Sequence, residues 1–264
     1  MVYVHPFAEE MNKSRRMAAL QSRALAQAGY AVLQVDLLGC GDSSGDFRDA
    51  SWADWLDDVV LAVRWMQQRH DAALWLWGLR AGCLLAAAAA QRMDAPCHFL
   101  FWQPVLSGKA TLQQFLRLKA AARLASGESK AILHAARADL HAGRPVEVAG
   151  YTLTRPLSQG LEAATLAPSA DLTATPGFVS PNLIWLELSN QPVPTLSPAS
   201  QPALQAWQAA GWAATALAIP GPSFWQTVEI EEAPALLDAT LGALAQAHAN
   251  PRLSAPLSTE ARVA

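Results

Sequence analysis

The sequence predicts an α/β fold in which a mostly parallel sheet carries helices on both faces. Short apolar runs typical of buried strands alternate along the chain with longer segments of helical period. This alternation is the pattern of a parallel sheet with crossover helices. The chain has 264 residues, of which 52% are apolar and 16% charged, so it is long enough for one α/β domain with an insertion.

The first half of the chain predicts four strands and three helices. Ser51 is followed three residues later by Asp54, a capping-box pair that marks the start of the second helix. We expect the strands at Met1–His5, Ala31–Leu37, Ala73–Trp77 and Cys97–Trp102, and the helices at Asn12–Ala28, over residues 52–66 and at Cys83–Met93.

The alternation stops after the fourth strand, which predicts an inserted lid over residues 109–181. The lid is expected to hold two helices, at Thr111–Leu124 and Glu128–Ala142. A short β-like piece at Val146–Leu153 follows, and then a loose Pro/Ala/Thr-rich link that extends to residue 181. Strands resume at Asn182–Leu188 and Trp212–Ile219, and a last helix follows at Ala233–Ala247. We therefore expect a single domain over 1–249 and a disordered tail over 250–264, which is rich in Pro, Ser and Ala.

Charge and cysteine content exclude several classes of protein. The net charge is −3 and no basic block is present, so we expect no nucleic-acid partner. The three cysteines have no metal-ligand spacing and are expected to be reduced thiols, with no metal site and no cofactor. No signal peptide is visible, and Arg80 with two glycines interrupts the most apolar stretch, Ala72–Ala90, so we expect no membrane segment and a cytoplasmic location.

Gly78 and Gly82 flank a sharp strand-to-helix turn with the spacing of the G-x-S-x-G nucleophile elbow. The residue between them is Arg80. The Asp36–Gly45 loop matches D-x-x-G-x-G-x-S-x-G, and His5-Pro6-Phe7 resembles the His-Gly loop that supplies an oxyanion amide. These three landmarks, in this order, predict the α/β-hydrolase fold with a helical lid.

The residues of a Ser-His-Asp triad are absent from their expected positions. Arg80 takes the place of the nucleophile, and residues 142–247 contain no histidine to act as the base. Asn190-Gln191-Pro192-Val193-Pro194 resembles a D-x-x-V-P segment with Asn in place of the acid. Three departures together argue against triad chemistry.

Several motifs together resemble the exosortase A system-associated hydrolase type two family. They are His5–Met17, Asp36–Gly45, Trp77–Arg80, Trp102-Gln103-Pro104 and Gly221–Trp225. The resemblance implies a bacterium that sorts surface proteins through exosortase and makes exopolysaccharide. It also implies members that begin further upstream with an extra β-hairpin, so we expect that hairpin to be missing here and Met1–His5 to be an interior strand.

Arg80 admits two interpretations. At the start of a helix and the floor of a pocket, it would bind an anion with the helix dipole. Alternatively it forms a structural ion pair with Glu9 or Glu10, because a buried charge is costly without a partner. Glu9 and Glu10 are in turn either general acid/base candidates or acids favoured by the start of a helix.

The other candidates also have a structural alternative. His5 would hydrogen-bond in the pocket, or it is a buried structural histidine; a catalytic Cys83 or Cys40 would need it as partner. Ser43, Asp36 and Asp42 are expected to brace their turn. The residues expected to line the pocket, or else to fill the core, are Leu79, Ala81, Phe7, Gln103 and Trp225.

Two functions follow. One is a hydrolase of an ester- or thioester-like bond through an atypical site at His5, Glu9, Glu10 and Arg80. The other is a catalytically inactive anion-binding or scaffold protein, whose ligand would be a small-molecule or a lipid- or saccharide-linked anion and whose partners would include exosortase-system proteins. The residues favour the second. A nucleophile or carboxylate within hydrogen-bond reach of His5 and facing the crevice would favour the first.

Overall fold

The computed structural model describes residues 1–93, 95–121, 129–169 and 181–249. Its main sheet has six strands in the order β2-β1-β3-β4-β7-β8, and every pair of neighbours is parallel. The strands are β1 (Val2–Val4), β2 (Leu33–Gln34), β3 (Trp75–Leu79), β4 (His98–Trp102), β7 (Asn182–Ser189) and β8 (Ala213–Pro220). The predicted parallel α/β architecture is confirmed.

β1 is an interior strand, as predicted for Met1–His5. Val2 is aligned with Leu33 of β2 on one side and with Leu76 of β3 on the other. The prediction for the second strand was too long, because only Leu33 and Gln34 form ladder pairs where Ala31–Leu37 was expected. β2 is an edge strand and is partly exposed, so the apolar run that carries it is paired on one side only.

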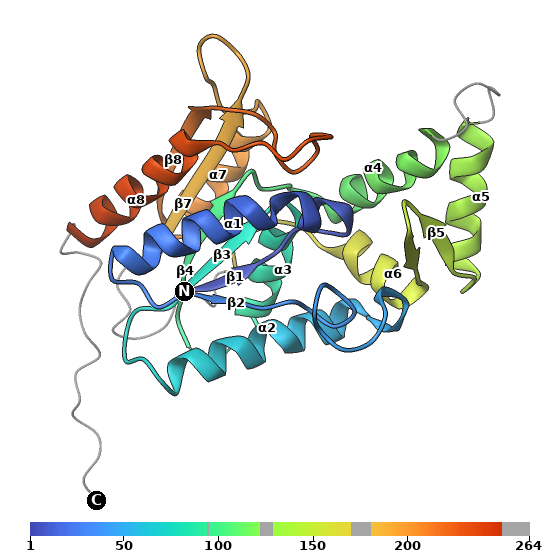
Figure 1. The fold of residues 1–264 in the computed structure, drawn as a ribbon, viewed down its shortest axis with the longest axis horizontal. Coiled ribbons are helices and arrows are strands. Elements are labelled where there is room, and N and C mark those ends of the chain that lie inside the picture. The colour runs from blue at the N-terminus through green and yellow to red at the C-terminus, as the bar shows by residue number, and fades with distance from the viewer. Residues whose placement is uncertain (94, 122–128, 170–180, 250–264) are drawn as a thin grey trace, which may run out of the picture.

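Helices cover both faces of the sheet (Figure 1). α1 (Glu9–Gln27) and α8 (Pro234–Ala249) pack on one face, where Met17, Leu25, Leu236 and Leu244 meet the tryptophans of β3 and β4. α2 (Trp52–Gln67), α3 (Ala81–Ala90) and α7 (Ser200–Ala209) bring their buried residues to the core on the other face. Two apolar cores therefore enclose the sheet and fix the carboxyl ends of its strands.

The predicted start of α2 is confirmed, whereas the predicted start of α1 is wrong by three residues. The capping box that starts α2 forms as predicted, because the Ser51 side chain accepts from the Asp54 N–H and the Asp54 carboxylate accepts from the Ser51 N–H. α1 begins at Glu9, three residues before the predicted Asn12, so Glu9 and Glu10 form its first turn. A short 3-10 helix, η1 (Phe47–Asp49), closes the glycine-rich loop.

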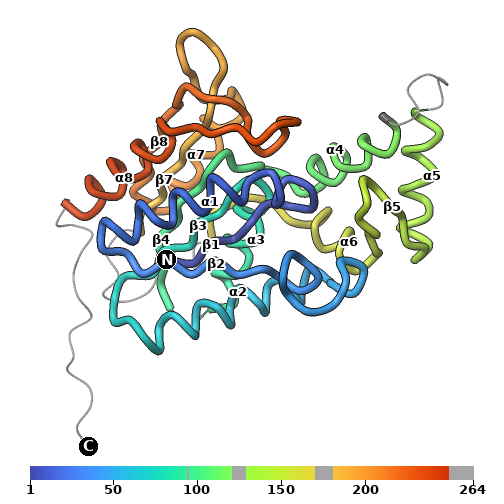
Figure 2. The backbone as a smooth tube through the Cα atoms, viewed as in Figure 1, coloured from blue at the N-terminus to red at the C-terminus, as the bar shows by residue number. Residues whose placement is uncertain are grey.

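The insert between β4 and β7 comprises α4 (Gly108–Ala121), α5 (Ser129–His141), a hairpin of β5 (Val146–Val148) and β6 (Tyr151–Leu153), and α6 (Arg155–Ala163). It lies at the end of the molecule where β1 ends and α1 begins (Figure 2). The loose link expected after Leu153 was wrong in its first part, because Thr154 and Pro156 start α6 there. α6 packs on α2, where a Cβ on Gly160 would lie 2.2 Å from that of Trp52.

Three further points concern a membrane segment, a metal site and the tail. None of the described helices is long and apolar enough to cross a membrane. Among the same residues, no group of His, Cys, Asp and Glu is arranged to hold a metal ion. The predicted tail, 250–264, lies outside the described residues.

Candidate functional site

Arg80 is at the apex of a sharp turn between β3 and α3. Its backbone has φ 55° and ψ −120°, a strained conformation for a residue with a side chain, and it is the N-cap of α3. The Arg80 N–H donates to the Trp102 carbonyl at 3.0 Å, which ties the turn to β4. The predicted elbow therefore forms, with an arginine where this turn usually presents a nucleophile.

Gly78 and Gly82 allow the turn to close. A Cβ on Gly78 would lie 2.7 Å from the backbone N of Cys83, and a Cβ on Gly82 would lie 2.2 Å from the Val4 carbonyl oxygen. Both contacts are with backbone atoms that cannot move aside. The predicted reason for the two glycines is therefore confirmed: backbone packs directly on backbone at this turn.

The Arg80 side chain is held by two partners. Its Nε and Nη2 atoms both donate to Oε1 of Glu10 at 3.2 Å, and its guanidinium carbon lies 5.3 Å from the ring centroid of Trp225. The Arg80 and Glu10 side chains are 12% and 13% exposed. The ion pair expected as the structural alternative therefore forms, with Glu10, and an aromatic ring packs near the cation.

Glu9 and Glu10 are both poorly solvated carboxylates. Burial raises the pKa of Glu10, and Arg80 offsets part of that rise through its charge and its hydrogen bonds. Burial also raises the pKa of Glu9, against the opposing effects of its own N–H and of Lys13. The Oε2 atoms of both residues are buried without a hydrogen-bond partner among the described residues. Each carboxyl is therefore easier to protonate than an ordinary glutamate.

A cavity of about 140 Å³ lies between the start of α1 and α4 of the insert. Of the predicted site residues it is lined by Phe7, Glu9 and Glu10, whereas Arg80 and Trp225 lie behind Glu10 and do not line it. Sequence reasoning missed the rest of its wall, which consists of Lys13, Thr111, Gln114, Phe115, Leu118 and Gln226.

Spacing alone identifies part of the missed wall. Lys13 lies one turn after Glu9 on α1, and the four residues of α4 have the i, i+3, i+4, i+7 spacing of one helical face. The sequence does not show which part of the core that face meets. In the structure this face of α4 meets the segment before α1, because the ring centroid of Phe115 lies 5.1 Å from that of Phe7.

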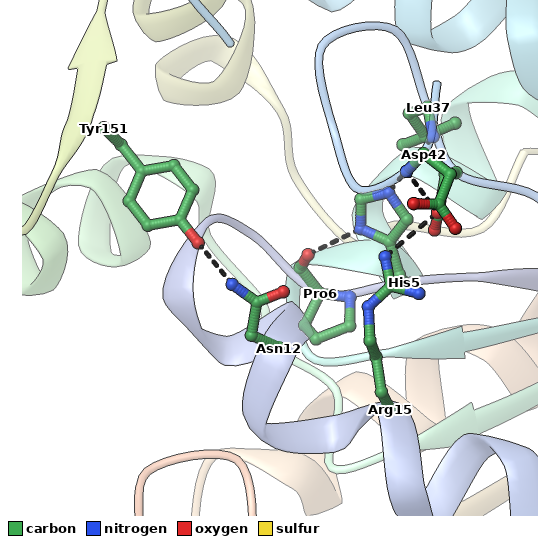
Figure 3. A network of polar contacts seen from close by, with 8 residues as sticks. His5, Pro6, Asn12, Arg15, Leu37, Asp42 and Tyr151 are labelled. Atoms are coloured by element: carbon green, nitrogen blue, oxygen red, sulfur yellow. Dashed lines mark hydrogen bonds and ion pairs between the residues drawn. The ribbon is translucent and has the colours of Figure 1, made fainter. Parts of the chain in front are cut away.

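His5 has a structural role (Figure 3). Its Nδ1 lies 2.8 Å from the Pro6 carbonyl, and its Nε2 accepts the Leu37 N–H at 3.4 Å. Both ring nitrogens therefore bind backbone, and burial lowers the pKa of the ring. Within the described chain no side-chain hydroxyl, thiol or carboxylate hydrogen-bonds to His5, so the arrangement that would favour triad-like chemistry there does not form.

The glycine-rich loop beside His5 is braced by the Asp36 side chain, as predicted, whereas Asp42 and Ser43 take part through their backbone N–H groups. Oδ2 of Asp36 accepts the Asp42 N–H and an Arg15 N–H, each at 2.9 Å. On the far side of the same region, Asn12 donates to the Tyr151 hydroxyl at 3.1 Å, which links α1 to the hairpin of the insert (Figure 3). These contacts fix the glycine-rich loop to α1, and α1 to the insert.

The remaining candidates are packed into the protein. The Gln103 side-chain oxygen accepts the Leu188 N–H at 2.7 Å, which joins the ends of β4 and β7. Leu79 and Ala81 are buried on either side of Arg80. Burial raises the pKa of Cys40 to about 12, and that of Cys83 well above its ordinary value. Neither thiol is therefore poised to form a thiolate.

The positions of the missing triad partners hold no acid and no base. Asn190 is exposed after the end of β7. The segment after β8, Gly221–Gln226, places Trp225 beside Arg80 and Gln226 at the cavity. Where a serine hydrolase would join a hydroxyl to an imidazole, this chain joins a guanidinium to a carboxylate and an indole.

Several solved structures, including those of esterases and lipolytic enzymes, share this architecture. Est1E from Butyrivibrio proteoclasticus, solved with ferulic acid bound, superimposes with a TM-score of 0.58 at 16% identity, covering 94% of this chain and 89% of that one. A structure of the metagenome-derived lipolytic enzymes LipS and LipT gives 0.54 at 17% identity, covering 93% and 92%. NosK from Streptomyces actuosus gives 0.51 at 19%, covering 94% and 98%. At these identities the likeness shows the fold.

Sequence comparison identifies the family. No curated protein sequence matches the chain significantly. The profile of a family described as "Serine aminopeptidase, S33" matches residues 1–150, which include β1, the glycine-rich loop, the elbow and most of the insert. The match and the six-stranded parallel sheet agree with each other, and the chain therefore belongs to the serine aminopeptidase S33 family of the α/β-hydrolase superfamily.

Proposed function

We propose that this protein is a hydrolase-fold binding protein that does not cleave its ligand through a serine triad. One observation carries the proposal: the apex of the nucleophile elbow is an arginine already neutralised by Glu10 and packed near Trp225. A fold does not determine activity, and the chemistry depends on the residues of the site. Here those residues form a stable ion pair instead of an activated nucleophile.

The ligand would bind in the cavity between α1 and the insert, with the insert acting as a lid over 109–181. Lys13 supplies the positive charge on the cavity wall for an anionic group, since Arg80 is already paired with Glu10, and the raised pKa of Glu9 makes that neighbouring carboxyl easier to protonate when the anion binds. Phe7, Phe115 and Leu118 supply an apolar wall, and Gln114 and Gln226 supply amides that fix orientation. We therefore propose a small anionic ligand with an apolar portion, free or linked to a lipid or saccharide.

The biological setting is part of the same proposal. The resemblance to the exosortase A system-associated hydrolases suggests a role beside exosortase-dependent protein sorting. The three cysteines are all free and buried, which supports a reducing compartment such as the cytoplasm. A pulldown from the native host, with bound proteins and metabolites identified by mass spectrometry, tests both points; recovery of neither exosortase-system proteins nor an anionic metabolite would contradict them.

A second candidate is hydrolysis of an ester- or thioester-like bond with Glu9 as the acid/base group. The raised pKa of Glu9 favours it, because proton transfer is most efficient when a group titrates near the working pH. Turnover of p-nitrophenyl esters and acyl thioesters separates the candidates. The binding protein shows no turnover above the uncatalysed rate; turnover that is lost in Glu9→Gln and kept in the control Glu147→Gln would establish the enzyme instead.

A further inference from the structure

A second cavity lies within the insert, away from the elbow. It is a groove of about 30 Å³ between α5 and α6, floored by Leu112 of α4. Its walls carry Arg137 and His141 from α5, one helical turn apart, and Arg155, Ser158, Gln159 and Glu162 from one face of α6. It shares no lining residue with the cavity at Glu9 and Glu10.

The charges in this groove are unbalanced. Neither Arg137 nor Arg155 takes part in an ion pair among the described residues. Asp139, the nearest acid on α5, is already occupied by Arg144, at 2.6 and 2.9 Å. Among the described residues, Glu162 is the one acid that lines the groove, against two arginines. The groove therefore has a net positive charge even when His141 is neutral.

The composition of the surrounding insert has the same sign. Residues 108–163 contain eight Lys and Arg against four Asp and Glu, a net charge of +4, in a chain whose total is −3. The rest of the chain accordingly carries −7. A positive groove on a positive insert attracts anions over a longer range than a single surface arginine does.

We infer that the groove between α5 and α6 is an oxyanion site that takes a phosphate group. Guanidinium groups bind tetrahedral oxyanions through paired N–H donors, and here two of them line one groove, Arg137 from α5 and Arg155 from α6. The Gln159 amide adds a donor on the same wall. The groove is small, so a ligand would contact it only through its phosphate group, and any larger body attached to the phosphate would stay outside.

The inference is independent of the proposed function, because it involves none of the residues around Arg80. A phosphate group can belong to a soluble metabolite or to a lipid head group. Both present the same chemistry to the two arginines, and the experiment below includes an arm for each source.

The test is titration of the whole protein with inorganic phosphate by isothermal calorimetry, at low and at near-physiological salt. We expect saturable one-site binding that weakens with salt, and at least a tenfold loss of affinity in the double variant Arg137→Gln/Arg155→Gln. Arg117→Gln is the matched control, because Arg117 is an exposed arginine of the insert that does not line the groove. Circular dichroism and melting temperature should be unchanged in both variants.

The second arm measures flotation with vesicles that contain phosphatidate. Binding to vesicles that the double variant loses supports the site with a lipid as the phosphate source, whereas binding of inorganic phosphate alone supports it with a soluble source. The inference is overturned if the wild type binds neither, if the double variant binds as tightly as the wild type, or if Arg117→Gln loses as much affinity as the double variant.

Discussion

Replacement of Arg80 by alanine should destabilise the protein mainly through Glu10. The two side chains are only 12% and 13% exposed, and the Oε2 atom of Glu10 already lacks a partner. Loss of Arg80 leaves the Oε1 atom without its two donors as well. Breaking a buried ion pair from one side typically costs 3–5 kcal/mol, and because the pair is partly solvated we expect about 3 kcal/mol at pH about 8.

This loss should depend on pH in a defined direction. Burial holds the folded-state pKa of Glu10 above its ordinary value, and Arg80 is what limits the rise. Without Arg80 the pKa of Glu10 rises further. The folded variant is therefore destabilised at high pH, where Glu10 is ionised, and this destabilisation disappears when the carboxyl is protonated. The penalty of Arg80→Ala should therefore shrink as pH falls from about 8 to about 5.

Urea denaturation, followed by tryptophan fluorescence at both pH values, measures the effect. In a Glu10→Gln background the same arginine replacement should cost under about 1 kcal/mol, because no charge is left unpaired. Arg15→Ala is the matched control: its pair with Asp36 is exposed and should contribute about 0–1 kcal/mol. A loss below about 0.5 kcal/mol, or one that is equal at both pH values and in both backgrounds, would refute the reasoning.

Three further predictions concern groups around the site and the sheet. Burial raises the folded-state pKa of Glu9, so ionisation of Glu9 destabilises the protein as pH rises above 4.5. The melting temperature of Glu9→Gln should match that of the wild type near pH 4 and exceed it increasingly toward pH 8. A difference in melting temperature that stays constant with pH would count against this. Burial, with the charge of His248, lowers the pKa of His98 from 6.5 to about 4, so the wild type should lose about 3 kcal/mol between those pH values as the native ring is forced to protonate. His98→Asn, which can still accept the Asn182 N–H that His98 accepts at 2.9 Å, should lose less in an acid titration followed by circular dichroism; an identical acid midpoint would contradict it. Gly82→Ala should lower the free energy of unfolding by at least about 2 kcal/mol, because its Cβ would lie 2.2 Å from the Val4 carbonyl oxygen. The control Gly242→Ala, in the middle of α8 with nothing within 4 Å, should be neutral or stabilising by up to about 1 kcal/mol. Equal urea midpoints for the two variants would be incompatible with the packing described.

The sheet and the elbow were readable from the sequence because their signals are local. A buried parallel strand is a continuous apolar run, as in Trp75–Leu79, and the turn after it needs glycine on both sides for a steric reason. α6 was missed because its start depends on Thr154 and Pro156 within a stretch rich in Pro, Ala and Thr, where composition suggested a link. Strand β2 was overestimated because pairing at a sheet edge depends on the neighbour and not on the run itself.

The site was readable in part for a similar reason. The ion pair of Arg80 could be expected, because a buried guanidinium requires a carboxylate and the first turn of α1 offered two. That Glu10 forms it, and that Trp225 lies near the cation, depends on how loops far apart in the chain converge. His5 and Gln103 were plausible pocket residues by position, but the backbone groups of Leu37 and Leu188 bind them instead.

Fluorophosphonate labelling measures directly whether this chain contains an activated serine nucleophile, which we propose it lacks. The protein would be treated with the probe as wild type and as Arg80→Ser, with a serine esterase as positive control, and any adduct would be mapped by peptide mass spectrometry. We expect no labelling of the wild type, and none of Arg80→Ser, because residues 142–247 contain no histidine to act as the base and both ring nitrogens of His5 bind backbone groups. Stoichiometric labelling of one serine in the folded wild type would contradict it.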